Sequence, residues 1–145
     1  MSEGWLTDDR INIVNSVNHW KEAITLVAQP LLAQGYISQH YINAVLQTHE
    51  RQGPYYLLAP GLALPHARPE QGALKNGLSL LHIKNGICFG SDENDPVYVV
   101  IMLCAFSGDE HVSLIAKLAG ILCDEEKLNR LLKAASKEAI QAVIN

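Results

Sequence analysis

VYVVIMLCA, at residues 97–105, is the most hydrophobic stretch of the chain and the one that decides the fold. A polar segment, Asp92–Pro96, precedes it, and the helix-start residues Ser107–Asp109 follow it. A short, continuous apolar run between such signals is typical of a strand that is covered on both faces, because a buried helix would need a longer run. We therefore expect these residues to form the central strand of a sheet.

Further strands are predicted on the N-terminal side of this run. Apolar residues between asparagines in Ile11–Val17 favour a short edge strand. Tyr55–Arg68 is apolar but broken by prolines, which favours a strand that feeds a stiff, extended loop. Leu78–Ile83 predicts a strand with both faces covered. A hairpin return through Asn85-Gly86 to Ile87–Phe89 is expected, because Asn-Gly favours tight primed turns.

Amphipathic patterns predict helices on both sides of the strands. The expected helices run from Trp20 to Gly35 with Asn18 as the cap, from Ser38 to Gly53 with Tyr41 on the apolar face, from Ser107 to Leu122, from Asp124 to Leu132, and from Ser136 to Val143. Pro30 counts against the last turn of the first helix. This order predicts an α/β fold in which a mixed β-sheet is sandwiched by helices on both faces. A chain of 145 residues is expected to form one domain, residues 1–145.

Composition and charge exclude several classes of function. Fifteen acidic residues against eleven basic ones leave a net charge of −4 with no basic stripe, which argues against nucleic-acid binding. Met1–Arg10 lacks the pattern of a signal peptide, and no stretch approaches the roughly 18 apolar residues of a membrane span, so a cytoplasmic protein without membrane insertion is expected. Cys88, Cys104 and Cys123 are far apart in apolar runs, which favours reduced, buried thiols over a disulfide or a zinc site.

His66 has the most unusual setting of the six histidines. Pro65 and Pro69 stiffen the loop on either side of it, and Arg68 lies two residues further on. A neutral imidazole held in this way attacks through one ring nitrogen while a carbonyl or carboxylate holds the proton on the other. Arg68 would offer its guanidinium donors to an anion. By composition alone, a histidine in a proline-flanked loop is more often an ordinary turn residue, and this interpretation stays open.

Three motifs around His66 carry a family resemblance. They are Gly-Pro-Tyr-Tyr at 53–56, Ala-Pro-Gly at 59–61 and Leu-Pro-His-Ala-Arg-Pro at 64–69, the last followed by the acidic Glu70. With them the chain, from about Asn12 to Ile144, resembles the EIIA proteins of the bacterial sugar phosphotransferase system (PTS), mannitol/fructose type (EIIA type 2). Within that family it is most similar to the branch of the ascorbate-specific and cryptic mannitol EIIA proteins.

The resemblance implies a phosphoryl relay and the mannitol/fructose-type EIIA fold. Phospho-HPr would donate a phosphoryl group to His66, and phospho-His66 would pass this group to a cysteine of a cognate EIIB. EIIB would serve sugar uptake through a membrane EIIC. The resemblance implies no cofactor and no metal. His111 matches an auxiliary second histidine of the family, and Arg68 is the candidate phosphate-binding cation. The mannitol branch also has an arginine in the helix before the active-site strand. The resemblance leaves open whether Arg51 corresponds to that arginine. The sugar is set by EIIC and cannot be predicted from this chain.

Two other functions are alternatives to the relay. A metallohydrolase built from His66, His82, His111 and a carboxylate is disfavoured, because no HExxH or paired metal-ligand spacing occurs. A regulatory EIIA-like module, whose phosphorylation state controls a partner protein, is an alternative that the sequence leaves open. Asp109 and Glu110 are left out of the site, since acidic residues at a helix start are equally explained by the helix dipole.

Overall fold

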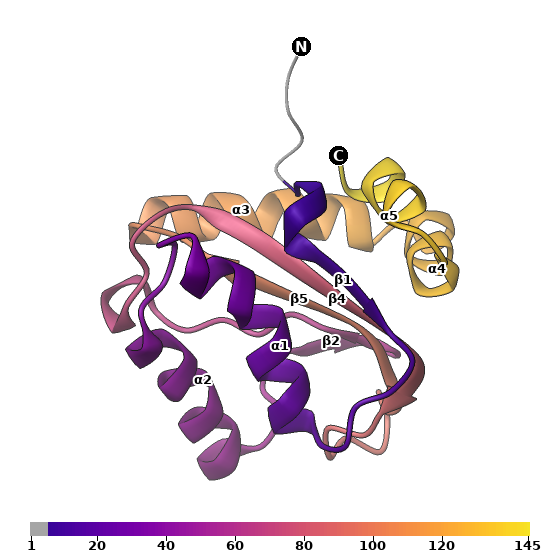
Figure 1. Cartoon of the computed structure of the whole chain (residues 1–145), viewed down its shortest axis with the longest axis horizontal. Coiled ribbons are helices and arrows are strands. Elements are labelled where there is room, and N and C mark those ends of the chain that lie inside the picture. Colours follow the sequence, from indigo (N-terminus) through magenta and orange to yellow (C-terminus); the bar gives the residue numbers. More distant parts are fainter. Residues whose placement is uncertain (1–5) are drawn as a thin grey trace.

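A five-stranded mixed sheet with strand order β1-β4-β5-β3-β2 lies at the centre of the fold (Figure 1). The computed structural model of the chain describes residues 6–145. The strands are β1 (Ile11–Val14), β2 (Leu57–Ala59), β3 (Leu62–Ala63), β4 (Gly77–Ile87) and β5 (Val97–Cys104). β5 pairs antiparallel with β4 and parallel with β3, β1 pairs parallel with β4, and β2 pairs antiparallel with β3. The prediction that residues 97–105 form the central strand is confirmed.

Helices cover both faces of this sheet, as predicted (Figure 1). One face carries α1 (Trp20–Ala33) and α2 (Gln39–Gln52), and the other carries α3 (Gly108–Leu122), α4 (Glu125–Lys133) and α5 (Lys137–Ile144). Residues of β5 alternate between the two cores, since Val100 and Met102 pack beneath α1 and α2 whereas Ile101 and Leu103 face the C-terminal helices. Burial of an aliphatic side chain contributes about 1.5–3 kcal/mol, so this two-sided burial of one strand stabilises both layers.

The helix starts in the C-terminal half lie where the sequence predicts them. The side chain of Ser107 accepts a hydrogen bond from the amide of Glu110 at 3.3 Å, and Asp124 and Ser136 cap α4 and α5 in the same way. These oxygens satisfy amide groups that the first turn of a helix leaves without a partner. Gly53 ends α2 with a φ of 86°, which favours glycine.

The N-terminal helix corrects two details of the prediction. The cap of α1 is His19 rather than Asn18, because the His19 Nδ1 accepts the amide of Lys21 at 3.1 Å. The amide of Asn18 instead donates to the Glu22 carboxylate at 2.7 Å. The helix also continues past Pro30 to Ala33. Leu31, which is fully buried, packs the last turn against the sheet and offsets the hydrogen bond that proline removes.

The predicted hairpin at Asn85-Gly86 is wrong. β4 runs on to Ile87, which pairs with Val97, and Gly86 with a φ of 72° lies where the register of the pair shifts. The chain reverses only in the following loop, where the Asp95 carboxylate accepts amides from Phe89, Gly90 and Ser91 at 2.7–2.8 Å. A primed turn needs residues with positive φ, and an irregularity in a strand can also use a glycine with positive φ, so the dipeptide alone does not distinguish them.

Three smaller expectations also need correction. The segment Tyr55–Arg68 forms two short antiparallel strands, β2 and β3, before the loop, rather than one strand. The edge strand β1 ends at Val14 instead of Val17. Of the three thiols only Cys104 is buried, while Cys88 and Cys123 are exposed.

None of the helices formed by residues 6–145 is both long and apolar enough to cross a membrane. Residues 1–5 of the segment considered for a signal peptide lie outside the described residues.

Candidate active site

The topology of the sheet brings His66 and His111 together. β3 and β5 are parallel neighbours, so their C-terminal ends lie at the same edge of the sheet. The loop after β3 carries His66, and α3, which follows β5, carries His111 in its first turn. The centroids of the two imidazole rings are 5.4 Å apart, with an angle of 64° between the ring planes. The carboxyl ends of neighbouring parallel strands are where α/β sheets commonly hold their sites.

One hydrogen bond determines which nitrogen of His66 is available. The Nδ1 atom lies 2.8 Å from the carbonyl oxygen of Leu64. Since a carbonyl oxygen only accepts, Nδ1 carries the proton of the neutral ring and donates it. The lone pair therefore resides on Nε2. His66 is half-buried and lines an open pocket with a volume of about 690 Å³. The site thus offers a nucleophilic Nε2 to a group that enters the pocket.

The backbone around His66 is held by two tyrosine hydroxyls. Tyr55 donates to the carbonyl oxygen of His66 at 2.5 Å. Tyr41 accepts the amide of Ala67 at 3.1 Å and donates to the carbonyl oxygen of Leu103 at 2.7 Å. Neither tyrosine was assigned to the site from the sequence. Tyr41 was expected on the apolar face of its helix, where it does lie, but periodicity says nothing of where its hydroxyl reaches.

His111 lies beside His66 at the same pocket, in surroundings that disfavour the charged form of its ring. Burial lowers the pKa of His111, the nearby His66 lowers that pKa further, and Glu70 opposes both effects. The Nδ1 atom of His111 is buried and has no hydrogen-bond partner among residues 6–145. A buried ring nitrogen without a partner is costly, and it is therefore available to a group that joins the site.

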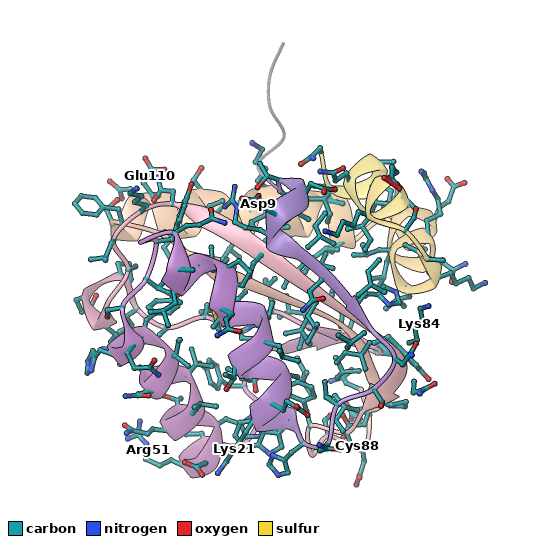
Figure 2. All side chains as sticks on the ribbon, viewed as in Figure 1. Asp9, Lys21, Arg51, Lys84, Cys88 and Glu110 are labelled. Carbon is teal, nitrogen blue, oxygen red and sulfur yellow. The ribbon has the colours of Figure 1, made fainter. Side chains whose placement is uncertain are left out.

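Two arginines supply positive charge at the same pocket. Arg68 comes from the loop and Arg51 from the last turn of α2, and both side chains are exposed. Figure 2 places Arg51 at the C-terminal end of α2 and Glu110 at the start of α3. Within residues 6–145 neither arginine forms an ion pair with a carboxylate. The structure thus places Arg51, whose place the sequence left open, at the pocket. Both guanidinium groups can bind an anion there.

The remaining predicted candidate, His82, does not belong to this site. It lies on β4 beneath α4, where its Nε2 is 3.1 Å from the carbonyl oxygen of Leu132. Among the described residues, no three histidine, cysteine or acidic side chains gather in a way that could hold a metal ion. The histidine triad of a metallohydrolase is therefore not assembled in this part of the chain.

Residues 5–145 match the family described as "Phosphoenolpyruvate-dependent sugar phosphotransferase system, EIIA 2". The chain belongs to this EIIA family. It is 42% identical over 142 residues to the mannitol-specific cryptic phosphotransferase enzyme IIA component of Escherichia coli (strain K12), covering 97% of this chain and 95% of that protein. It is 35% identical over 127 residues to the ascorbate-specific PTS EIIA component of the same strain, covering 87% and 82% of the two chains.

Solved structures support the EIIA fold. The solution structure of the E. coli mannitol-specific cryptic enzyme IIA superposes with a TM-score of 0.90 at 42% identity, over 97% of this EIIA chain and 95% of that one. The complex of E. coli mannitol enzyme IIA with phosphorylated enzyme IIB contains a chain that superposes with a TM-score of 0.81 at 25% identity, covering 95% of each. The predicted family, fold class and phosphotransferase activity of this EIIA chain are confirmed.

Proposed function

We propose that the chain carries a phosphoryl group on Nε2 of His66, in the cytoplasm, between phospho-HPr and a cysteine of a cognate EIIB, which serves a membrane EIIC. The observation that carries the proposal is the hydrogen bond between His66 Nδ1 and the Leu64 carbonyl, because it leaves Nε2 unprotonated. The pocket also holds two arginines that form no ion pair within residues 6–145. A protein-bound phosphoryl donor and a protein-bound acceptor also suit an open pocket better than a closed one. Residues 1–145 would act in this relay as one domain.

The chemistry balances without a cofactor. The Nε2 lone pair attacks phosphorus, the bond between phosphorus and the donor's imidazole nitrogen breaks, and that nitrogen keeps the electron pair. In the second step a thiolate of EIIB attacks the same phosphorus, and the pair of the broken P–N bond returns to Nε2. The Nδ1 proton stays on the ring in both steps, held by the Leu64 carbonyl. Transfer of this kind asks the protein for in-line positioning and for stabilisation of the equatorial oxygens.

Charge at the pocket matches what a phosphoryl group brings. A phosphoryl group on an imidazole adds close to two negative charges. Arg51 and Arg68 offer bidentate donors to its oxygens, and Gly108 places the positive end of α3 at the same pocket. His111 would donate a ring N–H to one of these oxygens. Because the added anion favours the protonated ring, it would oppose the burial that lowers the pKa of His111.

An apolar surface beside the pocket suits protein partners. Phe106, just before α3, and Val112, in α3, are 68% and 67% exposed, and Tyr55, whose ring contacts His66, is 37% exposed. Large apolar side chains exposed together are typical of protein interaction surfaces. A partner that covers them would exclude water from phospho-His66 and would limit hydrolysis during transfer.

Intact mass tests the proposal directly. After incubation with phosphoenolpyruvate, enzyme I and HPr, the protein should gain one phosphoryl group, about 80 Da, which brief acid treatment removes. His66→Ala should gain none, while His40→Ala, which removes an exposed histidine of α2 outside the pocket, should gain one. A His66→Ala variant that still takes up phosphate, or a wild-type protein that takes up none, would contradict the assignment.

A second assay separates transport from regulation. When the charged protein is mixed with a cognate EIIB, loss of the phosphoryl group within seconds supports the transport relay. Slow loss, together with phosphorylation-dependent binding to a protein that is not part of a transporter, supports the regulatory alternative.

A further inference from the structure

The tripeptide Leu64–His66 is attached at both ends to the pair Tyr55 and Tyr56. The amide of Leu64 donates to the carbonyl oxygen of Tyr56 at 2.9 Å. At the other end, the hydroxyl of Tyr55 donates to the carbonyl oxygen of His66 at 2.5 Å. Within the tripeptide, the imidazole of His66 donates back to the Leu64 carbonyl at 2.8 Å. The bond that selects the tautomer of His66 therefore lies inside a loop whose shape the two tyrosines hold.

Tyr55 also contacts the side chain of His66. The centroids of the two rings are 5.7 Å apart and their planes meet at 74°, an edge-to-face arrangement. The Tyr55 ring in turn packs edge-to-face with the Tyr56 ring, with 4.8 Å between the two centroids. Tyr55 thus touches His66 twice, at the peptide through its hydroxyl and at the imidazole through its ring.

We infer that Tyr55 is a positioning residue for phosphoryl transfer, whose hydroxyl holds the His66 peptide group so that Nε2 stays directed into the pocket. The inference rests on the proposed function, in which Nε2 of His66 carries the phosphoryl group. Two different partners must meet the same nitrogen in line, and misplacement by about 1 Å costs as much as 100-fold in rate. Pro65 and Pro69 restrict the backbone of the loop. Without a hydrogen bond to the His66 carbonyl oxygen, however, the direction of Nε2 would be less well defined.

The hydroxyl of Tyr55 keeps its proton under working conditions. Burial raises the pKa of Tyr55 to about 12. The Tyr55 hydroxyl therefore remains a donor to the His66 carbonyl oxygen at any pH at which phospho-HPr phosphorylates the protein. The tyrosine does not take part in the bond changes, and its role is limited to geometry.

The adjacent tyrosine provides a matched control. The Tyr56 hydroxyl lies 2.6 Å from Nδ1 of His49 in the core. Among residues 6–145 this hydroxyl forms no hydrogen bond with Leu64–His66, to which Tyr56 is joined through its main-chain carbonyl oxygen. Tyr55→Phe and Tyr56→Phe each remove one hydroxyl and keep the ring. Tyr56→Phe leaves buried His49 without its partner and is expected to lower Tm, whereas Tyr55→Phe, at a partly exposed position, is expected to change Tm little.

Two measurements on these variants test the inference. Tyr55→Phe should lower the saturating rate of charging by phospho-HPr roughly 2- to 12-fold, the factor that the net contribution of one hydrogen bond corresponds to, with an unchanged KM for HPr. In ¹⁵N spectra of the uncharged protein, the two ring nitrogens of His66 should have well-separated shifts in the wild type and should move toward each other in Tyr55→Phe, as the bond to Leu64 weakens. Tyr56→Phe should match the wild type in both measurements despite its lower Tm.

The outcomes separate this inference from the proposed function. Equal charging rates and equal His66 spectra in Tyr55→Phe and the wild type would overturn the positioning role, as would the same loss in Tyr55→Phe and Tyr56→Phe. If the wild type accepts no phosphoryl group, the proposed function fails, and unchanged His66 nitrogens in Tyr55→Phe would then overturn the positioning role on their own.

Discussion

Substitution of Tyr41 by phenylalanine should destabilise the protein, because it removes the hydroxyl that links the loop carrying His66 to the central strand β5. Tyr41 is fully buried, accepts the amide of Ala67 at 3.1 Å and donates to the carbonyl oxygen of Leu103 at 2.7 Å. Phenylalanine keeps the ring, so no cavity opens, but the amide of Ala67 loses its partner in a residue that is 8% exposed. A buried polar group left unpaired costs roughly 1–3 kcal/mol, and we expect a loss of about 2 kcal/mol.

Urea unfolding followed by circular dichroism measures this loss, and the slope with denaturant should stay unchanged because the exposed surface does not change. For a chain near this size the expected loss corresponds to a fall in Tm of about 4–8 °C. Hydrogen exchange identifies the cause, since the amide of Ala67 should lose protection more than amides of α4. Tyr36→Phe is the control, because within residues 6–145 its hydroxyl forms no hydrogen bond. A loss below about 0.5 kcal/mol, or an Ala67 amide that stays protected, would refute the reasoning.

Further predictions concern pH and the charged side chains of the pocket. Burial lowers the pKa of His49 and of His82 below 6.5, so the folded state binds fewer protons than the unfolded state as pH falls below that value. The free energy of unfolding should therefore be highest above about pH 6.5 and fall below it, by up to about 1.4 kcal/mol per pH unit for each histidine; a flat profile in urea titrations between pH 7 and 5 would contradict this. Arg68→Ala should slow both charging and discharge about 10- to 1000-fold in rapid-quench assays, and Arg51→Ala should slow both in the same direction; rates equal to the wild type would show that these arginines do not contact the phosphoryl group. His111→Ala should slow transfer to an EIIB thiol more than charging by HPr, by about 10-fold or more, and equal losses in the two half-reactions would rule out that role.

Local signals accounted for much of the fold. The apolar run at residues 97–105, the caps at Ser107 and Asp124, and the stop at Gly53 were all readable because each depends on residues within one or two turns of chain. The errors occurred where one local signal serves two structures. Asn85-Gly86 suits a hairpin turn as well as a bulge, and β4 continues through it because a partner residue, Val97, is available on β5.

The site shows the same division between local and long-range information. Proline-flanked His66 and its neighbour Arg68 stood out from sequence, and the family resemblance added His111. Tyr55 belonged to a motif that carried the resemblance but had no assigned role, since nothing in the spacing shows that its hydroxyl reaches the His66 carbonyl. For Arg51 the sequence left the register with the family arginine open, and only the tertiary structure places it, in the last turn of α2, among the residues that line the pocket.

The sequence by itself determined the fold class, the central strand, most helix boundaries and the stiff loop that carries His66, because apolar periodicity, capping and proline act over short distances. Only the tertiary structure decided that β3 pairs parallel with β5, which brings the rings of His66 and His111 to 5.4 Å. It also decided the hydrogen bonds of Leu64, Tyr41 and Tyr55 that hold His66 and its loop and leave Nε2 of the neutral ring unprotonated. Strand pairing and side-chain reach depend on segments far apart along the chain, and their free energy is gained only when those segments pack together.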